Sequence, residues 1–249
     1  TAPQILFPVL SSAISDARIR NALLNKIIAG APWGVNFIDY ASINSDPIAA
    51  ADLLEGLTRR GVTLEDEARA RVLVRLTTIG KTTAAWRYYS AMNPRADPRR
   101  SRDARFSTNL EIPSPFDWTP INDPMGISSS IQRGSDGAGV FDFHVPATGN
   151  GPILRQLQVL PPGSYRLIGR SNGIDQAADA RPYWSLSCSD GKEIGRVEVP
   201  NSKQNGGVFS GRFVVPSGCT AQTLALIARA SDAVGGVSGQ IDRAELGPE

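Results

Sequence analysis

The stretch Phe141-Asp142-Phe143-His144-Val145 alternates apolar and polar side chains, which is the period of two expected of a half-buried β-strand. Further runs share this period, and turn-forming glycine, proline, serine or aspartate residues bound them. These runs are Tyr165 to Leu167, Trp184 to Cys188 and Phe209 to Val215. Roughly eight short strands with no helical pattern between them predict an antiparallel β-sandwich of the jelly-roll type over residues 116–249.

The first part of the chain, residues 1–93, has the helical period instead. Asp46 followed by Pro47 is typical of a helix start, and Thr63 with Asp66 resembles a capping box. Apolar residues three and four positions apart form the expected inward faces, and Gly30, Gly61, Gly80 and Asn93 mark the expected ends. These faces are Leu23, Leu24, Ile27 and Ile28; Ala50, Leu53, Leu54 and Leu57; Leu64, Ala68, Val72 and Leu76; and Ala85, Trp86 and Tyr89. Short loops between such helices predict antiparallel helical hairpins, and we expect the apolar opening at 5–10, broken by Pro8, to be a strap across them.

Residues 94–115 combine prolines with five arginines and predict a linker between the two parts, so the fold class is α+β with several domains. The arginines are Arg95, Arg99, Arg100, Arg102 and Arg105. They could form a patch for an anionic polymer, or they could be a solvated connector paired with Asp97 and Asp103. Because no aromatic residue lies between the arginines for base stacking, we favour the connector.

Composition excludes some classes of protein. The 26 basic and 24 acidic residues leave a formal charge of +2, so no global field attracts nucleic acid or an anionic membrane. No run of about 18 apolar residues occurs, so we expect no membrane span in this chain. The start at Thr1, without an initiator methionine, suggests that a leader or a membrane anchor has been removed or left out of this sequence.

The chain has two cysteines, Cys188 and Cys219, and both lie in the predicted sandwich. One disulfide between them would stabilise the fold by about 3 to 4 kcal/mol in the chain-entropy model. A disulfide predicts an oxidising compartment, which for a bacterial protein is the periplasm or the exterior. The alternative is a pair of buried free thiols.

Several segments of the C-terminal half together resemble carbohydrate-binding-module-like, galactose-binding-type jelly rolls. They are Phe116-Asp117-Trp118, Pro161 to Leu167, Tyr183 to Cys188, Phe213 to Cys219 and Gly239 to Leu246. Residues 47–93, with Ala84 to Tyr89 in the closing helix, resemble a degenerate tetratricopeptide-type repeat, although an ordinary helical domain explains them equally well. The combination resembles bacterial envelope proteins associated with exopolysaccharide, and the resemblance implies a saccharide ligand.

If the sandwich has a ligand face, the polar positions of its strands should line it. The candidates are Asp142, His144, Arg166, Arg170, Tyr183 and Arg212. Arginine and aspartate suit vicinal hydroxyls or acidic sugars, and tyrosine can stack on a sugar ring. We expect Trp184 to lie in the core, whereas Tyr183 points the other way. The alternative is an ordinary solvated sheet face.

The sequence has little that indicates catalysis. His144 is the sole histidine, and no nucleophile-elbow motif accompanies it. Gly80-Lys81-Thr82 mimics the end of a phosphate-binding loop but lacks the first glycine, where Arg75 stands. We expect no cofactor and no metal, although Asp142 could approach Asp175 or Asp179 to form an acid pair.

We therefore expect a non-catalytic binding or scaffolding protein of the bacterial cell envelope, periplasmic or extracellular, linked to exopolysaccharide production or export. Its partners would be a polysaccharide or oligosaccharide and an envelope protein held by the helical part. Two alternatives remain: a purely structural adaptor without a sugar ligand, and a polysaccharide-modifying enzyme.

Overall fold

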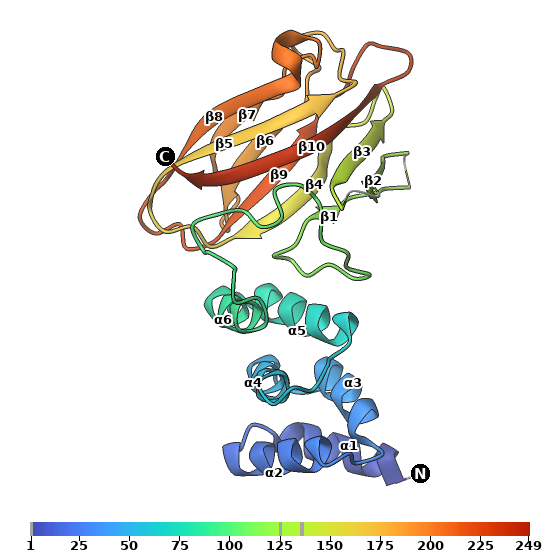
Figure 1. The fold of residues 1–249 in the computed structure, drawn as a ribbon, viewed down its shortest axis with the longest axis vertical. Helices are drawn as coiled ribbons and strands as arrows, with labels where there is room; N and C mark the ends of the chain where they lie inside the picture. The colour runs from blue at the N-terminus through green and yellow to red at the C-terminus, as the bar shows by residue number, and fades with distance from the viewer. Residues whose placement is uncertain (1, 125, 135–136) are drawn as a thin grey trace. The chain divides into compact units, whose positions relative to one another are not determined.

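The computed structural model describes residues 2–124, 126–134 and 137–249, and the chain divides into two compact units. The helical unit comprises Thr1–Arg95 with Leu110–Pro115, and the sandwich unit comprises Ala96–Asn109 with Phe116–Glu249. The protein is therefore mixed α and β, with helices first and strands after them (Figure 1). No described helix is both long and apolar enough to cross a lipid bilayer.

Six helices form the described part of the helical unit, and they lie in two rows (Figure 1). Helices α1, α3 and α5 contact one another in turn, as do α2, α4 and α6. Their apolar faces meet between the rows, where Leu53, Leu54 and Val72 are fully buried. The bounds are α1 Ala2–Ala13, α2 Ala17–Ile28, α3 Gly34–Asn44, α4 Pro47–Thr58, α5 Asp66–Thr78 and α6 Thr82–Met92.

The start of α4 is as predicted. The Asp46 carboxylate accepts hydrogen bonds from the backbone N–H groups of Ile48 and Ala49 at 3.0 and 2.9 Å. The start of α5 differs: Glu65 occupies the N-cap position without a side-chain hydrogen bond, so the capping box expected at Thr63 is wrong.

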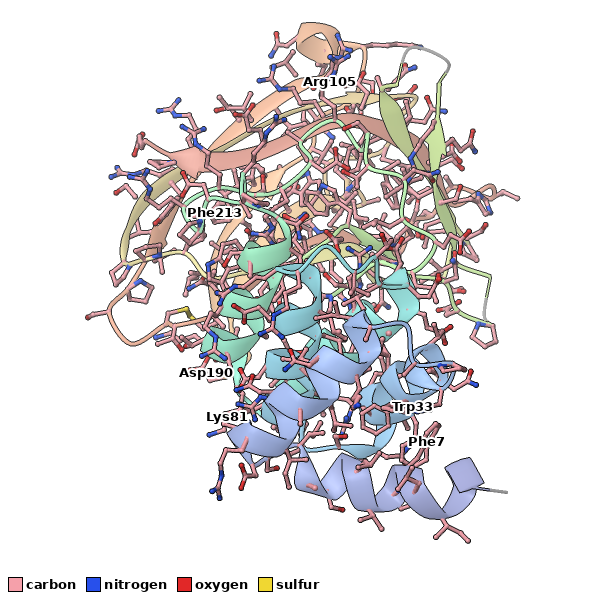
Figure 2. All side chains as sticks on the ribbon, turned by 60° about the horizontal axis from the view of Figure 1, so that its bottom comes forward. Phe7, Trp33, Lys81, Arg105, Asp190 and Phe213 are labelled. Carbon is pink, nitrogen blue, oxygen red and sulfur yellow. A yellow bond between two sulfur atoms is a disulfide. The ribbon has the colours of Figure 1, made fainter. Side chains whose placement is uncertain are left out.

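The prediction of a strap at residues 5–10 is also wrong, because these residues belong to α1 with Pro8 inside the helix. Proline removes one backbone hydrogen bond but leaves the turns on either side able to form. Phe7, which is labelled in Figure 2, is buried. Its ring centroid lies 5.4 Å from that of Phe37 and 5.6 Å from that of Tyr40. This packing on α3, a helix that the sequence pattern did not reveal, outweighs the local cost of the proline.

Among its described residues, the sandwich unit has ten strands, in two five-stranded antiparallel sheets. Sheet A has the order β1-β4-β9-β6-β7, and sheet B has the order β2-β3-β10-β5-β8. The bounds are β1 Thr119–Pro120, β2 Ser128–Arg133, β3 Gly139–Val145, β4 Gly151–Gln158, β5 Gly163–Asn172, β6 Tyr183–Cys188, β7 Glu193–Glu198, β8 Val208–Val215, β9 Gln222–Ala228 and β10 Val237–Pro248. A short 3-10 helix, Gln204–Gly207, precedes β8.

The alternation in the sequence correctly predicted which side chains enter the core. Phe141, Phe143 and Val145 are buried in β3, and Trp184 is fully buried in β6. The two inner faces of the sheets enclose one apolar cluster, as expected of a sandwich.

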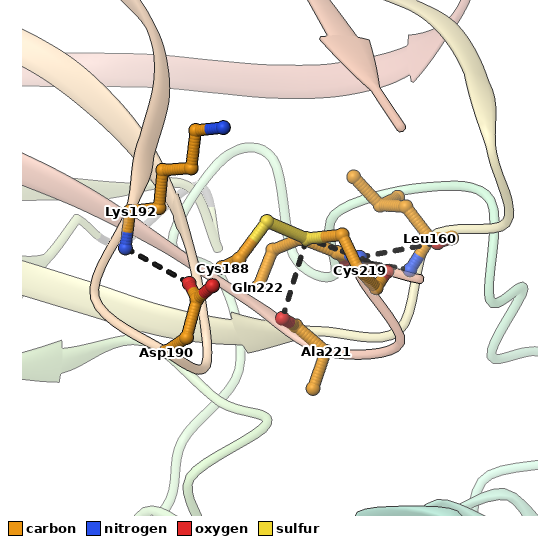
Figure 3. The surroundings of a disulfide bond; sticks show 7 residues. All are labelled: Leu160, Cys188, Asp190, Lys192, Cys219, Ala221 and Gln222. Carbon is orange, nitrogen blue, oxygen red and sulfur yellow. Dashed lines mark hydrogen bonds between the residues drawn. A yellow bond between two sulfur atoms is a disulfide. The ribbon is translucent and has the colours of Figure 1, made fainter. Parts of the chain in front are cut away.

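The predicted disulfide is present between Cys188, at the end of β6, and Cys219, in the loop before β9 (Figure 3). Their Cα atoms are 5.6 Å apart. The side chain of Gln222 holds this loop, because its amide donates to the carbonyl of Cys219 at 2.6 Å and to that of Leu160 at 3.2 Å. Disulfides of this kind are typical of oxidising compartments.

Residues 96–109 do not form the predicted linker, because they pack on the sandwich. The backbone N–H of Ser101 donates to the carbonyl of Leu246 at 2.9 Å, and the Leu246 N–H donates to the Ser101 hydroxyl at 2.8 Å. Farther along β10, the N–H of Ala244 donates to the carbonyl of Ala104 at 2.9 Å. Arginine and proline density suggested a solvated connector, but the backbone groups of this segment pair with the strand beside it.

Phe106 anchors the same segment, since its side chain is fully buried in the core cluster. The backbone passes directly over Gly139, whose N–H donates to the carbonyl of Arg105 at 2.8 Å. A Cβ atom at position 139 would lie 2.0 Å from the carbonyl oxygen of Phe106. Only glycine allows this approach.

Gly139→Ala is therefore expected to lower the free energy of unfolding of the sandwich unit by about 2 to 3 kcal/mol, because the overlap forces the backbone apart. Urea unfolding followed by hydrogen exchange of β3 peptides measures the change. Gly235→Ala is the matched control: no heavy atom lies within 4 Å of its Cβ position, and we expect a change within about 0.5 kcal/mol. Equal stability of the two variants would contradict the packing of residues 96–109 on β3.

Candidate ligand-binding site

Five of the six candidate ligand residues lie on the outer face of sheet B. They are Asp142 and His144 on β3, Arg166 and Arg170 on β5, and Arg212 on β8. Each alternates along its strand with buried residues, so its side chain points away from the core. Strand β10 lies between β3 and β5 and completes this surface.

The arginines of this surface are held by carboxylates within it. Arg170 donates to Asp242 at 2.7 Å. Arg166 and Arg212 both contact Glu249, at 2.8 and 2.7 Å. The hydrogen bond from Arg166, aided by the charge of Arg212, holds the pKa of the Glu249 carboxyl below its usual value. Their positive charges are thus already engaged before any ligand arrives.

The β3 candidates also have partners on the neighbouring strand. Gln240 donates to the Asp142 carboxylate at 2.8 Å, and the His144 Nδ1 lies 2.9 Å from the hydroxyl of Ser238. The sequence pattern did not indicate this contact, because Ser238 lies 94 positions after His144. Ser238 is the hydrogen-bond partner of His144 in the described part of the chain, and both are exposed on the sheet.

Tyr183 is not brought together with the other candidates, because β6 belongs to sheet A. Its ring is contacted from both flanking strands. The guanidinium carbon of Arg196, on β7, lies 4.6 Å from the ring centroid, and that of Arg229, just after β9, lies 4.4 Å away. Arg229 also donates to Glu198 at 2.7 Å. Alternation predicts which side of a strand a residue occupies, but it does not say to which sheet the strand belongs.

A pocket of about 390 Å³ lies between two loops of the sandwich unit, one joining β5 to β6 and the other joining β9 to β10. Carboxylates, an amide, a hydroxyl and small apolar side chains line it. These residues are Asp175, Gln176, Ala177, Asp179, Ala180, Ala230, Ser231, Asp232 and Ala233.

Gln176 ties the two loops together. Its side-chain amide donates to the carbonyl of Gly236 at 3.1 Å, and its side-chain oxygen accepts a hydrogen bond from the Ser231 hydroxyl at 2.7 Å. Its backbone N–H donates to the Asn201 side chain at 2.9 Å. Gly236 has φ +69°, and a Cβ there would lie 2.1 Å from the carbonyl oxygen of Val145. The pocket wall is therefore preorganised by side-chain hydrogen bonds and a required glycine.

The three carboxylates of this pocket differ in their surroundings. Asp175 accepts a hydrogen bond from Asn201 at 3.2 Å and lies 4.0 Å from the Lys203 ammonium. Asp179 and Asp232 are exposed and have no hydrogen-bond or ion-pair partner among the described residues. Two carboxylates are thus available to accept hydrogen bonds from a ligand.

Sequence reasoning had considered Asp175 and Asp179 only as acids beside Asp142, and it missed Gln176, Ser231 and Asp232. The structure instead places Asp142 on sheet B, bonded to Gln240. The two pocket loops are far apart in sequence and have no periodicity, so no pattern joins them. In the described ranges, no group of three or more histidine, cysteine, aspartate or glutamate side chains is arranged to hold a metal ion.

No protein-family model matches this chain, and no curated protein matches it. Among solved structures, a carbohydrate-binding module of family 4 has 13% identity and a TM-score of 0.40, over 60% of this chain and 99% of its own. The xylan-binding CBM22-1 domain from Paenibacillus barcinonensis has 11% identity and a TM-score of 0.34, over 52% of this chain and 83% of its own. The enzymatically active domain of bacteriophage CBA120 tailspike protein 4 has 13% identity and a TM-score of 0.38, over 61% of this chain, and the match spans only 22% of the tailspike chain. Several of the solved structures that are similar to this chain are thus carbohydrate-binding modules.

Proposed function

We propose that the sandwich unit is a non-catalytic, jelly-roll carbohydrate-binding domain whose ligand enters the pocket between the β5–β6 and β9–β10 loops. The observation that carries this proposal is the pair of carboxylates of Asp179 and Asp232, without partners among the described residues, on the wall of a preorganised pocket. Carboxylates accept hydrogen bonds from hydroxyl groups, and the alanine side chains offer an apolar surface to the C–H face of a sugar ring. The volume of this pocket, about 390 Å³, lies within the range of about 300 to 1,000 Å³ that is usual for small-molecule sites.

The charges of the pocket favour a neutral saccharide. Three carboxylates, those of Asp175, Asp179 and Asp232, would repel the carboxylate or sulfate of an acidic sugar. The candidate arginines of sheet B are engaged by carboxylates of the same sheet, so they do not offset these charges. The pocket therefore supports neutral hydroxyl-rich sugars better than acidic ones.

The test is a glycan array with the full chain, followed by titration calorimetry of the glycans that bind. We expect Asp179→Ala combined with Asp232→Ala to weaken binding at least about tenfold, because hydrogen bonds to charged groups contribute about 1.5 to 3 kcal/mol each. Asp190→Ala, an exposed aspartate outside the pocket, is the control for the loss of an acidic residue, and we expect its affinity to change less than about twofold.

Arg212→Ala and Tyr183→Ala test the two outer sheet faces separately. If either variant abolishes binding while the double aspartate variant keeps it, the ligand occupies that sheet and the pocket assignment is wrong. If the chain binds no glycan, the proposal of carbohydrate binding fails and a structural adaptor is favoured, in line with the internally paired surface of sheet B.

We further propose that the chain works outside the cytoplasm, in the periplasm or at the cell exterior, as a scaffold in exopolysaccharide production or export. The disulfide supports the oxidising compartment. The two rows of helices, which we interpret as degenerate tetratricopeptide-type hairpins, would hold an envelope protein. Polysaccharide turnover lost in Asp142→Ala would instead favour a modifying enzyme.

A further inference from the structure

The helical unit has a surface pocket of about 470 Å³, built by α2, α4 and α6. Its rim is rich in arginine. The lining residues are Arg20, Asn21, Leu24, Asp52, Glu55, Gly56, Arg59, Arg60 and Arg87.

Ion pairs hold most of the rim. Asp52 lies between two guanidinium groups, 3.5 Å from that of Arg20 and 2.8 Å from that of Arg87. Glu55, whose side chain is only 10% exposed, pairs with Arg59 at 2.5 Å. Arg60 is exposed and has no ion-pair partner among the described residues. Four arginines against two carboxylates leave a surplus of two positive charges around one pocket.

Leu24 and Gly56 are the apolar residues of the lining, and Leu24 is buried. A Cβ atom at Gly56 would lie 2.9 Å from Cδ1 of Leu24, so α2 and α4 approach each other closely at this point. The Arg20 guanidinium donates to the carbonyl of Ile14 at 2.7 Å, which positions it on the rim. A ligand would therefore meet mainly charged and polar side chains, with planar guanidinium groups as the main hydrogen-bond donors.

We propose that this pocket binds an acidic segment of a partner protein, with a carboxylate of that segment on Arg60 and with the segment competing with Asp52 for Arg87. Guanidinium groups suit carboxylates because their planar N–H donors match two oxygens. The carboxylates of Asp52 and Glu55 between the arginines favour a peptide whose acidic side chains are separated by small uncharged ones. A uniformly charged polyanion would be repelled by Asp52 and Glu55. This inference rests on the proposed role of the helical unit in holding a partner protein, and it does not depend on saccharide binding by the sandwich unit.

Fluorescence anisotropy with the full chain tests the proposal. The probe is a labelled octapeptide with three glutamates among alanine and glycine residues. The comparison peptide has glutamine in place of each glutamate. We expect the glutamate peptide to bind and the glutamine peptide to bind at least about tenfold more weakly, since the charge-assisted bonds are lost. Affinity should fall as sodium chloride rises, because the rim is exposed to solvent.

Two variants should shift this affinity in opposite directions. Arg60→Gln with Arg87→Gln is expected to weaken binding about tenfold, and it leaves Asp52 paired with Arg20. Asp52→Asn should strengthen binding several-fold, because it removes the carboxylate that competes for Arg87. Arg18→Gln with Lys26→Gln removes the same charge from α2 outside the pocket, and we expect an effect below about twofold.

Other results would overturn the proposal. Equal binding of the two peptides, no binding of either, or an equal loss in the Arg18 and Lys26 control would show that the pocket does not recognise carboxylates. Displacement of the peptide by polygalacturonate at lower concentration would identify an acidic polysaccharide as the ligand instead. If the double arginine variant does not fold, the Asp52→Asn variant tests the proposal by itself. Unchanged or weaker binding of the glutamate peptide by this variant would then contradict the proposal.

Discussion

Arg102→Met is expected to lower the free energy of unfolding of the sandwich unit by about 3 to 5 kcal/mol, because it leaves several buried acceptors without their donor, at about 1 to 3 kcal/mol each. Arg102 is only 9% exposed, and its guanidinium donates to the side-chain oxygen of Gln158 at 2.8 Å and to the carbonyl of Phe116 at 3.0 Å. It also donates to the carbonyl of Leu157. Methionine fills similar space but leaves these buried acceptors without their donor.

The backbone of Arg102 strengthens the same connection. Its N–H donates to the side-chain oxygen of Gln156 at 3.1 Å, and the Gln156 amide donates back to its carbonyl at 3.0 Å. Gln156 and Gln158 are fully buried in β4, so the network joins residues 96–109 to sheet A. Loss of the side chain should therefore also loosen the backbone of this segment.

Urea unfolding with hydrogen exchange of β4 peptides measures this effect in the sandwich unit alone. The control is Arg99→Met in the same segment, whose exposed side chain pairs with Asp97 at 3.3 Å. Exposed pairs contribute about 0 to 1 kcal/mol, so we expect a small change. If Arg102→Met were no more destabilising than Arg99→Met, the network would not contribute to stability.

Removal of the disulfide is expected to destabilise the sandwich unit by about 3 to 4 kcal/mol, because the cross-link restricts the unfolded chain over a separation of 31 residues. Cys188→Ala combined with Cys219→Ala should show this loss in urea unfolding under oxidising conditions. We expect the helical unit to keep its unfolding midpoint, since it contains neither cysteine.

Reduction of the unchanged protein gives an independent measure of the same effect. A reducing agent should lower its stability to about that of the double variant, while the double variant itself should not respond. Two reactive thiols in the untreated, denatured protein would contradict the bond and remove the main support for an oxidising compartment.

The sequence predicted elements whose signals are local. The alternation around Phe141 and Phe143 identified the core side of β3, and Asp46 with Pro47 identified the start of α4. The cysteine pair was also predicted, because two cysteines allow only one intramolecular bond. The predictions of a strap at residues 5–10 and of a linker at 94–115 were wrong, because tertiary packing outweighed the local composition there. Phe7 and Phe106 illustrate this, since both are buried by residues far away in the sequence.

In the candidate site, too, the sequence predicted the local features and the tertiary structure decided the rest. The period of two determined that Asp142, Arg170 and Tyr183 point out of the core, because neighbouring side chains on a strand face opposite sides. Only the tertiary structure decided that Tyr183 lies on another sheet, that the arginines are already paired, and that two distant loops enclose a pocket. The physical reason is that strand alternation is a property of the local backbone, whereas sheet membership, ion pairing and loop juxtaposition depend on contacts between residues far apart in the chain.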